Sequence, residues 1–191
     1  TGSYEIGVMK AFQKQAKLQI AAISAASIGT LNAYAWLCGK ISDAEQIWKS
    51  VYAETMGKSY RTLIKNRGIY DYIDIICKET DFLSAPLYTV CTSPSTFQPC
   101  YILLNELEYE KRKEFLKASI TMFPVMPAHI INHVSYYDGA VMDNTPFLPL
   151  KEYEFDCVVV VQFDHYQSPE WVQQFSCPLF FLNPQKECKL S

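Results

Sequence analysis

The sequence lacks two features that would each indicate a class of protein: a long apolar run and a basic cluster. A membrane-spanning helix needs about 20 consecutive apolar residues, and no apolar run approaches that length. The densest basic segment is EKRK at 110–113, and the formal net charge is −3, so nucleic acid is not an expected partner. The sequence therefore favours neither an integral membrane protein nor a nucleic-acid-binding protein.

Closely spaced cysteine pairs are also missing. The seven cysteines include no CxxC pair and no Cys/His spacing typical of a zinc site. Most of them lie inside apolar segments, so we interpret them as reduced thiols of the core. An odd number of cysteines in a chain of this length favours a reducing compartment, and we expect a cytoplasmic protein.

What the sequence does contain is enough apolar material for a core. Apolar residues make up 49% of the 191 residues and charged residues 19%, which is typical of a folded globular chain. A chain of this length favours one domain. Because the sequence starts abruptly at TGSYEIG, we expect a single domain over residues 1–191 that is incomplete at both ends.

Helical and strand patterns alternate along the chain, which predicts the α/β class. We expect a three-layer α/β/α arrangement around a mostly parallel central sheet. The predicted helices cover residues 2–17, 28–38, 42–54, 70–78 and 106–120, and the predicted strands cover residues 18–24, 87–92, 100–104, 128–132, 134–137, 157–163 and 179–183.

A serine lies between small residues where a predicted strand meets a predicted helix, in ISAASIGTLNA at 23–33. Ala25, Ser27 and Gly29 fit the nucleophile elbow G-x-S-x-G, with alanine in place of the first glycine. Such a turn raises the hydroxyl above the sheet and directs the N–H of Ile28 toward an oxyanion. The same small residues are also compatible with ordinary packing.

A nucleophilic serine needs a base, and the residues offer two arrangements. Asp138, in SYYDGAVMDNTP, follows two tyrosines at the end of a predicted strand, and burial there would raise its pKa toward that of a base. Alternatively, Ser27, Asp138 and His165 follow the serine–acid–histidine order of α/β-hydrolases. Asp-Gly is also a common turn pair, so Asp138 has a structural interpretation as well.

Taken together, four segments resemble the patatin-like phospholipases, and they occur in that family's order. The segments are GSYEIGVMKAF at 2–12, ISAASIGTLNA at 23–33, KASITMFPVMP at 117–127 and YYDGAVMDNTP at 136–146. They are similar to the end of the family's glycine-rich loop with its following helix, to the elbow, to a helix end and to the D-G-[GA] segment.

The resemblance implies a serine–aspartate dyad of Ser27 and Asp138 that cleaves phospholipids or related lipid esters through an acyl-enzyme. Gly2 and the N–H of Ile28 would bind the oxyanion, and Gly139 would complete the aspartate motif. No metal and no other cofactor is implied. The partner would be a lipid ester substrate met at a membrane surface. Ala25 replaces the family's glycine, and most of the glycine-rich loop would precede Thr1.

Two alternatives remain at this stage. One is a small-ester hydrolase that uses a triad of Ser27, Asp138 and His165. The other is a catalytically silent patatin-like module that binds lipid or a protein partner.

Overall fold

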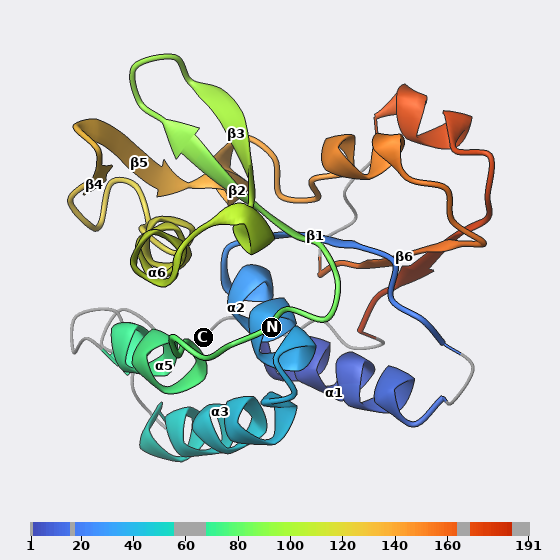
Figure 1. Cartoon of the computed structure of the whole chain (residues 1–191), viewed down its shortest axis with the longest axis horizontal. Coiled ribbons are helices and arrows are strands. Elements are labelled where there is room, and N and C mark those ends of the chain that lie inside the picture. The colour runs from blue at the N-terminus through green and yellow to red at the C-terminus, as the bar shows by residue number, and fades with distance from the viewer. Residues whose placement is uncertain (1, 16–17, 56–67, 164–168, 185–191) are drawn as a thin grey trace.

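A computed structural model describes residues 2–15, 18–55, 68–163 and 169–184 of the chain (Figure 1). The predicted alternation of helices and strands is present, and the α/β class is confirmed. The α-helices are α1 (Gly2–Gln13), α2 (Ile28–Leu37), α3 (Ile41–Thr55), α5 (Gly68–Ile76) and α6 (Tyr109–Ala118). The strands are β1 (Ile23–Ala26), β2 (Leu87–Ser93), β3 (Gln98–Leu103), β4 (His129–Ile131), β5 (Val134–Asp138), β6 (Val158–Val161) and β7 (Leu179–Leu182). Short 3-10 helices complete the description: η1 (Leu104–Glu106), η2 (Gly139–Val141), η3 (Leu148–Glu152) and η4 (Glu170–Gln174).

Strand β2 is the centre of a five-stranded sheet. It pairs in parallel with β1 and antiparallel with β3 and β5, and β5 in turn pairs antiparallel with β4. A second sheet consists of β6 and β7, which are parallel. The predicted parallel arrangement therefore holds at β1–β2, where the serine turn begins, and at β6–β7.

The antiparallel pairs differ from the predicted mostly parallel pattern, and short turns explain them. Two strands joined by a tight hairpin must run in opposite directions. Strands β4 and β5 are joined by Asn132 and His133, whose φ angles of 49° and 64° suit a two-residue hairpin turn. The loop at 94–97 joins β2 to β3 in the same way, and it ends at Phe97 with a φ of 51°.

The predicted strand at 18–24 is shifted in the structure. Strand β1 begins only at Ile23 and runs to Ala26, so it ends next to the serine. Its register explains the shift, because Ile23–Ala26 are the residues that meet Leu87–Val90 of β2. The apolar residues just before Ile23 resemble a strand in sequence but pair with no strand of the described part of the chain.

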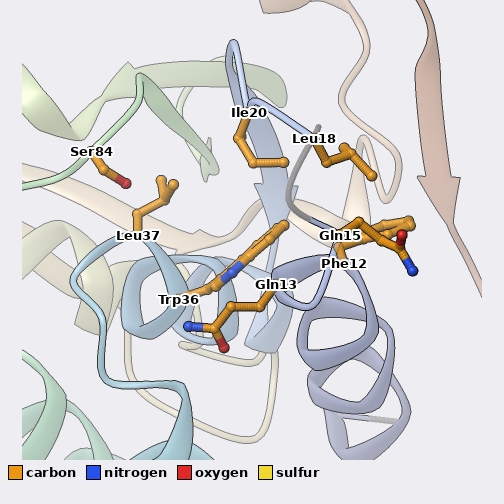
Figure 2. A pocket seen from close by; sticks show the side chains of 8 residues that line it. All are labelled: Phe12, Gln13, Gln15, Leu18, Ile20, Trp36, Leu37 and Ser84. Carbon is orange, nitrogen blue, oxygen red and sulfur yellow. The ribbon is translucent and has the colours of Figure 1, made fainter.

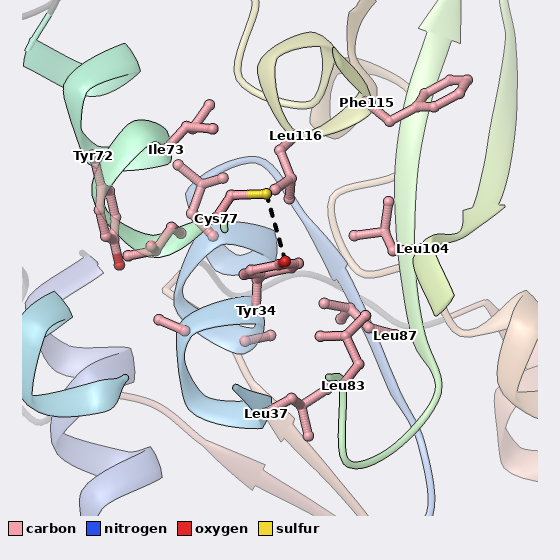
Figure 3. Packing of buried hydrophobic residues seen from close by; sticks show 14 of the residues in the cluster. Tyr34, Leu37, Tyr72, Ile73, Cys77, Leu83, Leu87, Leu104, Phe115 and Leu116 are labelled. Atoms are coloured by element: carbon pink, nitrogen blue, oxygen red, sulfur yellow. Dashed lines mark hydrogen bonds between the residues drawn. The ribbon is translucent and has the colours of Figure 1, made fainter. Parts of the chain in front are cut away.

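One hydrophobic core joins the helices to the sheet. Tyr34 of α2, which has no exposed surface, lies at its centre among leucines and isoleucines of α5, β2 and α6 (Figure 3). The Cys77 thiol donates a hydrogen bond to the Tyr34 hydroxyl at 3.5 Å, and that hydroxyl lies 3.2 Å from Asp81 Oδ2, to which it donates. Helices α1, α2, α3 and α5 lie together on one side of β1 (Figure 1). This packing holds α2, the helix that follows the serine, against β1 and β2.

A smaller core lies under the C-terminal part of the chain. Phe147, Leu150, Val158, Val160 and Val172 form its buried centre. Six cysteines of the described ranges are free thiols: Cys38, Cys77, Cys91, Cys100, Cys157 and Cys177. Cys77 and Cys91 are buried as predicted for core thiols, whereas Cys157 is exposed.

Candidate active site

Ser27 lies at the turn between β1 and α2, where the sequence predicted it. Its φ of 53° and ψ of −135° place it in a backbone region that non-glycine residues rarely adopt. Holding a residue there costs on the order of 1–3 kcal/mol, and such strain is concentrated at functional sites. The strained backbone is the first structural sign that this turn is an elbow.

Close packing on both sides of Ser27 fixes the turn. A methyl group built on Gly29 would lie 3.8 Å from Cβ of Ala25, so two small residues face each other across the elbow. The Thr30 hydroxyl donates to the Ala25 carbonyl at 3.1 Å and lies 2.9 Å from the Thr89 hydroxyl of β2. The first turn of α2 is thus tied by hydrogen bonds to both β1 and β2.

The Ser27 hydroxyl does not do what a serine in this position usually does. A serine that precedes a helix normally caps it by accepting a backbone N–H of the first turn. Ser27 is the N-cap of α2, yet its side chain makes no capping bond. Instead, Ser27 Oγ donates to Oδ2 of Asp138 at 2.5 Å. The hydroxyl is directed away from the helix and toward a carboxylate 111 residues further along the chain.

Strand pairing explains how Asp138 reaches Ser27. Along one edge of β2, β3 pairs with residues 88–93. Strands β1 and β5 lie end to end along the other edge of β2: β1 pairs with residues 87–90 and β5 pairs with residues 91–92. The last residue of β1 therefore faces Val90, and the last residue of β5, Asp138, faces Cys91. The two strand ends meet, and Ser27 and Asp138 lie at the junction.

Local hydrogen bonds orient the Asp138 side chain. The N–H of Ala140 donates to Oδ1 at 2.9 Å, which leaves Oδ2 for Ser27. The backbone N–H of Asp138 donates to the Thr121 carbonyl at 2.8 Å. Gly139 must be glycine here for reasons of space, because a Cβ would lie 2.4 Å from the backbone of Val90. The Asp-Gly pair thus serves close strand packing in addition to turning the chain.

Burial changes the acidity of Asp138. Only 4% of the residue is exposed, and loss of hydration disfavours the charged carboxylate. Burial therefore raises the pKa of Asp138 from 3.8 to about 6, although the hydrogen bonds from Ser27 and from the Ala140 N–H oppose the rise. A carboxylate with this pKa is a better base than an exposed aspartate and is still mostly ionised at neutral pH.

The two predicted oxyanion donors lie at helix starts. Ile28 is the first residue of α2, and the first N–H groups of a helix have no partner within it. Gly2 is the first residue of α1 and is buried, and a Cβ on it would lie 2.1 Å from the Trp48 indole. Its carbonyl accepts a hydrogen bond from Nδ2 of Asn32 at 3.1 Å.

Sequence reasoning missed a buried polar cluster behind the serine. Nδ2 of Asn32 also donates to Glu5 Oε2 at 2.6 Å, and Oδ1 of Asn32 accepts from Trp48 and Tyr72. Burial raises the pKa of Glu5 to about 7, although the hydrogen bond from Asn32 opposes the rise. The one feature of the sequence that could have indicated this cluster is the single asparagine inside the largely apolar helix IGTLNAYAWL.

The described histidines are not partners of the serine. Nε2 of His129 lies 2.8 Å from Glu114 Oε2, and His133 is exposed in the turn between β4 and β5. His165, the third member of the alternative triad, lies outside the described residues.

Exposed apolar side chains flank Asp138. Phe123 and Val125 come from the loop after α6, and Val141 and Met142 follow Gly139; their exposed fractions range from 44% to 61%. The Phe123 ring contacts the Tyr137 ring at a centroid distance of 5.2 Å, which brings this loop beside the aspartate. We call these four residues the apolar rim. They form a surface that apolar substrate chains can contact.

A separate pocket lies at the opposite end of α2 from Ser27 (Figure 2). Among the described residues that line it there is one serine and neither a carboxylate nor a histidine. Its lining consists of Phe12, Gln13, Gln15, Leu18, Ile20, Trp36, Leu37 and Ser84. Within the described ranges, no three His, Cys, Asp or Glu side chains are placed so that they could hold a metal ion.

Comparison with known families assigns the chain. No helix in the described part of the chain combines the length and the apolar character that crossing a membrane requires. None of the curated proteins matches the chain. A family model described as patatin-like phospholipase, in contrast, matches residues 1–151 of the 191, which includes both Ser27 and Asp138. This chain belongs to the patatin-like phospholipase family.

Proposed function

We propose that the protein is a lipid acyl hydrolase, of the phospholipase A or lysophospholipase type, that uses Ser27 and Asp138 as a catalytic dyad. Membership of the family indicates lipid acyl hydrolysis as the general activity. The observation that carries the finer proposal is the hydrogen bond from Ser27 Oγ, on a strained turn, to the buried carboxylate of Asp138.

The reaction proceeds in two halves. Ser27 Oγ attacks the ester carbonyl carbon while its proton passes to Oδ2 of Asp138, and the N–H of Ile28 together with Gly2 stabilises the oxyanion. The intermediate collapses to an acyl-Ser27, and the leaving alcohol takes the proton from Asp138. Asp138 then removes a proton from water, which attacks the acyl carbonyl. Fatty acid leaves, and Ser27 regains its proton.

The direct contact between the two side chains favours a dyad over a triad. In a triad, the imidazole stands between serine and carboxylate and bonds to both. A 2.5 Å contact between Ser27 Oγ and Asp138 Oδ2 leaves no room for a ring between these atoms. The apolar rim beside Asp138 supports a lipid substrate, since acyl chains bind to exposed apolar surface.

A labelling experiment tests the proposal. The wild-type protein is expected to react with a fluorophosphonate, in which Ser27 Oγ displaces fluoride, and to hydrolyse a short p-nitrophenyl ester and a micellar phosphatidylcholine. Ser27→Ala should lose both properties, and His165→Ala should keep them. Inactivity of His165→Ala would favour the triad. A wild-type protein that is neither labelled nor active would be a silent binding module.

The acidity of Asp138 predicts the pH dependence. Only the ionised carboxylate can accept the serine proton, and the pKa of Asp138 is about 6. We expect kcat/KM for a soluble ester to be flat above about pH 7 and to fall about tenfold per pH unit below about pH 6. A pH–rate profile from about pH 4.5 to about pH 9 measures this. A profile that stays flat over the acidic part of this range would contradict the assignment of Asp138 as the base.

A further inference from the structure

The Asn32 side chain makes every hydrogen bond that an amide can make. Its Nδ2 group donates to the Gly2 carbonyl at 3.1 Å and to Glu5 Oε2 at 2.6 Å. Its Oδ1 accepts from Trp48 Nε1 at 3.0 Å and from the Tyr72 hydroxyl at 2.8 Å. An amide has two donor hydrogens and two acceptor lone pairs, so the capacity of Asn32 is fully used.

The partners also fix the orientation of this amide. The Trp48 indole N–H can only donate, and the Gly2 carbonyl can only accept. Turning the amide over would place an NH2 group against an N–H and an oxygen against a carbonyl. Because Asn32 has no exposed surface, water cannot take over either contact. The side chain therefore has one orientation, and it sets where its partners lie.

Four helices meet at this one side chain. Gly2 and Glu5 belong to α1, Trp48 to α3 and Tyr72 to α5, while Asn32 lies on α2 five residues after the serine. The Glu5 carboxylate also lies against the elbow, 3.5 Å from where a methyl group on Gly29 would be. The start of α1 is thus held alongside the first turns of the helix that carries the nucleophile.

Gly2 is fixed from two sides. Asn32 binds its carbonyl, and the Trp48 indole occupies the space that a side chain on Gly2 would need. A shift of Gly2 along α2 would break its hydrogen bond to Asn32, and a shift toward α3 would bring it into a steric clash with the Trp48 indole. The backbone at Gly2 consequently has a defined position relative to Ser27 and Ile28.

We propose that Asn32 is a positioning residue for the oxyanion hole, which holds the Gly2 backbone in register with the Ser27–Ile28 turn. The inference rests on the proposed hydrolase function. Oxyanion donors act only when they point to the site where charge develops, and loss of one donor costs about 10²–10³ in rate. Asn32 touches neither substrate nor reacting atoms, and it acts through Gly2.

An exchange of two side chains separates this role from general packing. In the double variant Glu5→Gln/Asn32→Asp, the amide and the carboxylate trade places. The carboxylate placed on α2 still accepts from Trp48 and Tyr72, and the amide placed on α1 donates to it, so the buried contacts and the net charge are retained. Only the Gly2 carbonyl loses its hydrogen-bond donor. Tyr72→Phe is the matched control, because it removes one hydrogen bond of Asn32 and leaves the bond to Gly2.

The experiment measures Tm, kcat and KM for a soluble p-nitrophenyl ester, and the inhibition constant of a trifluoromethyl ketone. This ketone forms a hemiketal with an activated serine, and its oxyanion occupies the same hole as that of the transition state. We expect the exchange variant to have a Tm close to that of Tyr72→Phe, a kcat about 30-fold or more below wild type and a KM within about threefold. Its inhibition constant should rise by the same factor as kcat/KM falls.

Each outcome of this experiment either supports or overturns the positioning role of Asn32. Wild-type kcat in a folded exchange variant overturns the inference, and so does a fall in kcat without weaker inhibition. If the exchange variant fails to fold, Asn32→Ser replaces it, since a smaller side chain admits water to the freed partners, and the same comparison applies. A wild-type protein that hydrolyses no ester refutes the proposed function itself and the inference with it.

Discussion

Asp138→Asn is expected to lose about 10³-fold or more in ester hydrolysis and, at about pH 8, to be more stable than the wild type. The loss follows because an amide cannot accept the proton of Ser27. The geometry should persist, since the new amide oxygen can accept from the Ala140 N–H and the amide nitrogen can donate to Ser27 Oγ. The expected loss of activity therefore comes from removal of the proton acceptor and not from a change in structure.

The gain in stability follows from the raised pKa. Because the pKa of Asp138 is about 6 in the folded protein and 3.8 ordinarily, the folded state binds the proton more tightly than the unfolded state. The resulting stabilisation is fully present below pH 3.8 and is lost as the pH rises to about 6. The loss is about 3 kcal/mol. Because Asp138→Asn avoids this loss, its Tm should rise by on the order of 6–12 °C.

Thermal unfolding at the same mildly alkaline pH, together with ester hydrolysis, measures both effects. Ser27→Ala is the control, because it should be equally inactive while it leaves Asp138 buried and ionised. An Asp138→Asn variant that is less stable than Ser27→Ala under these conditions would contradict the burial argument. Retained hydrolysis would contradict the dyad.

Gly139→Ala is expected to be strongly destabilising, although it adds only one methyl group. The added Cβ would lie 2.4 Å from the Val90 backbone, and neither strand can yield without breaking the β2–β5 pairing next to Asp138. Overpacking against side chains costs typically about 1–3 kcal/mol, and a rigid backbone should bring the cost to about 3 kcal/mol or more. Displacement of Asp138 should lower kcat about 10²-fold even where the protein remains folded.

Gly7→Ala provides the matched comparison. Gly7 lies in α1, and no atom lies within 4 Å of a Cβ built there. Alanine favours a helix over glycine by about 1 kcal/mol, so this variant should be as stable as wild type or more so. Thermal unfolding of both variants measures the difference. Equal Tm values would show that the strands at Gly139 can separate without cost.

The sequence predicted the helices, the strands and the position of the serine turn more accurately than it predicted how the strands pair. Ser27 was identified from a local pattern, since small residues on both sides of a serine are a direct consequence of the turn. The antiparallel partners of β2 were not predicted, because the residues of a strand do not specify which other strand pairs with each of its two edges. The start of β1 was misplaced because apolar residues before Ile23 carry the same pattern as the strand itself.

The role of Asn32 was beyond local patterns. Its four partners come from α1, α3 and α5, so no spacing within the sequence links them. Gly139 was recognised as part of a motif, but its steric reason became visible only when β2 was placed against it. The partners of Asn32 and the steric restriction at Gly139 are tertiary contacts, which a single sequence does not reveal.

The end-to-end arrangement of β1 and β5 along β2 has a consequence for the order of folding. Ser27 and Asp138 are separated by 111 residues, so bringing them together closes a long loop, with an entropy cost that local helix formation does not carry. During synthesis, the turn at Ser27 and the pairing of β1 with β2 can form while β5 is still unmade. The turn that carries Ser27 can therefore form first, and Ser27 gains its hydrogen bond to Asp138 only when β5 pairs with the remaining edge of β2.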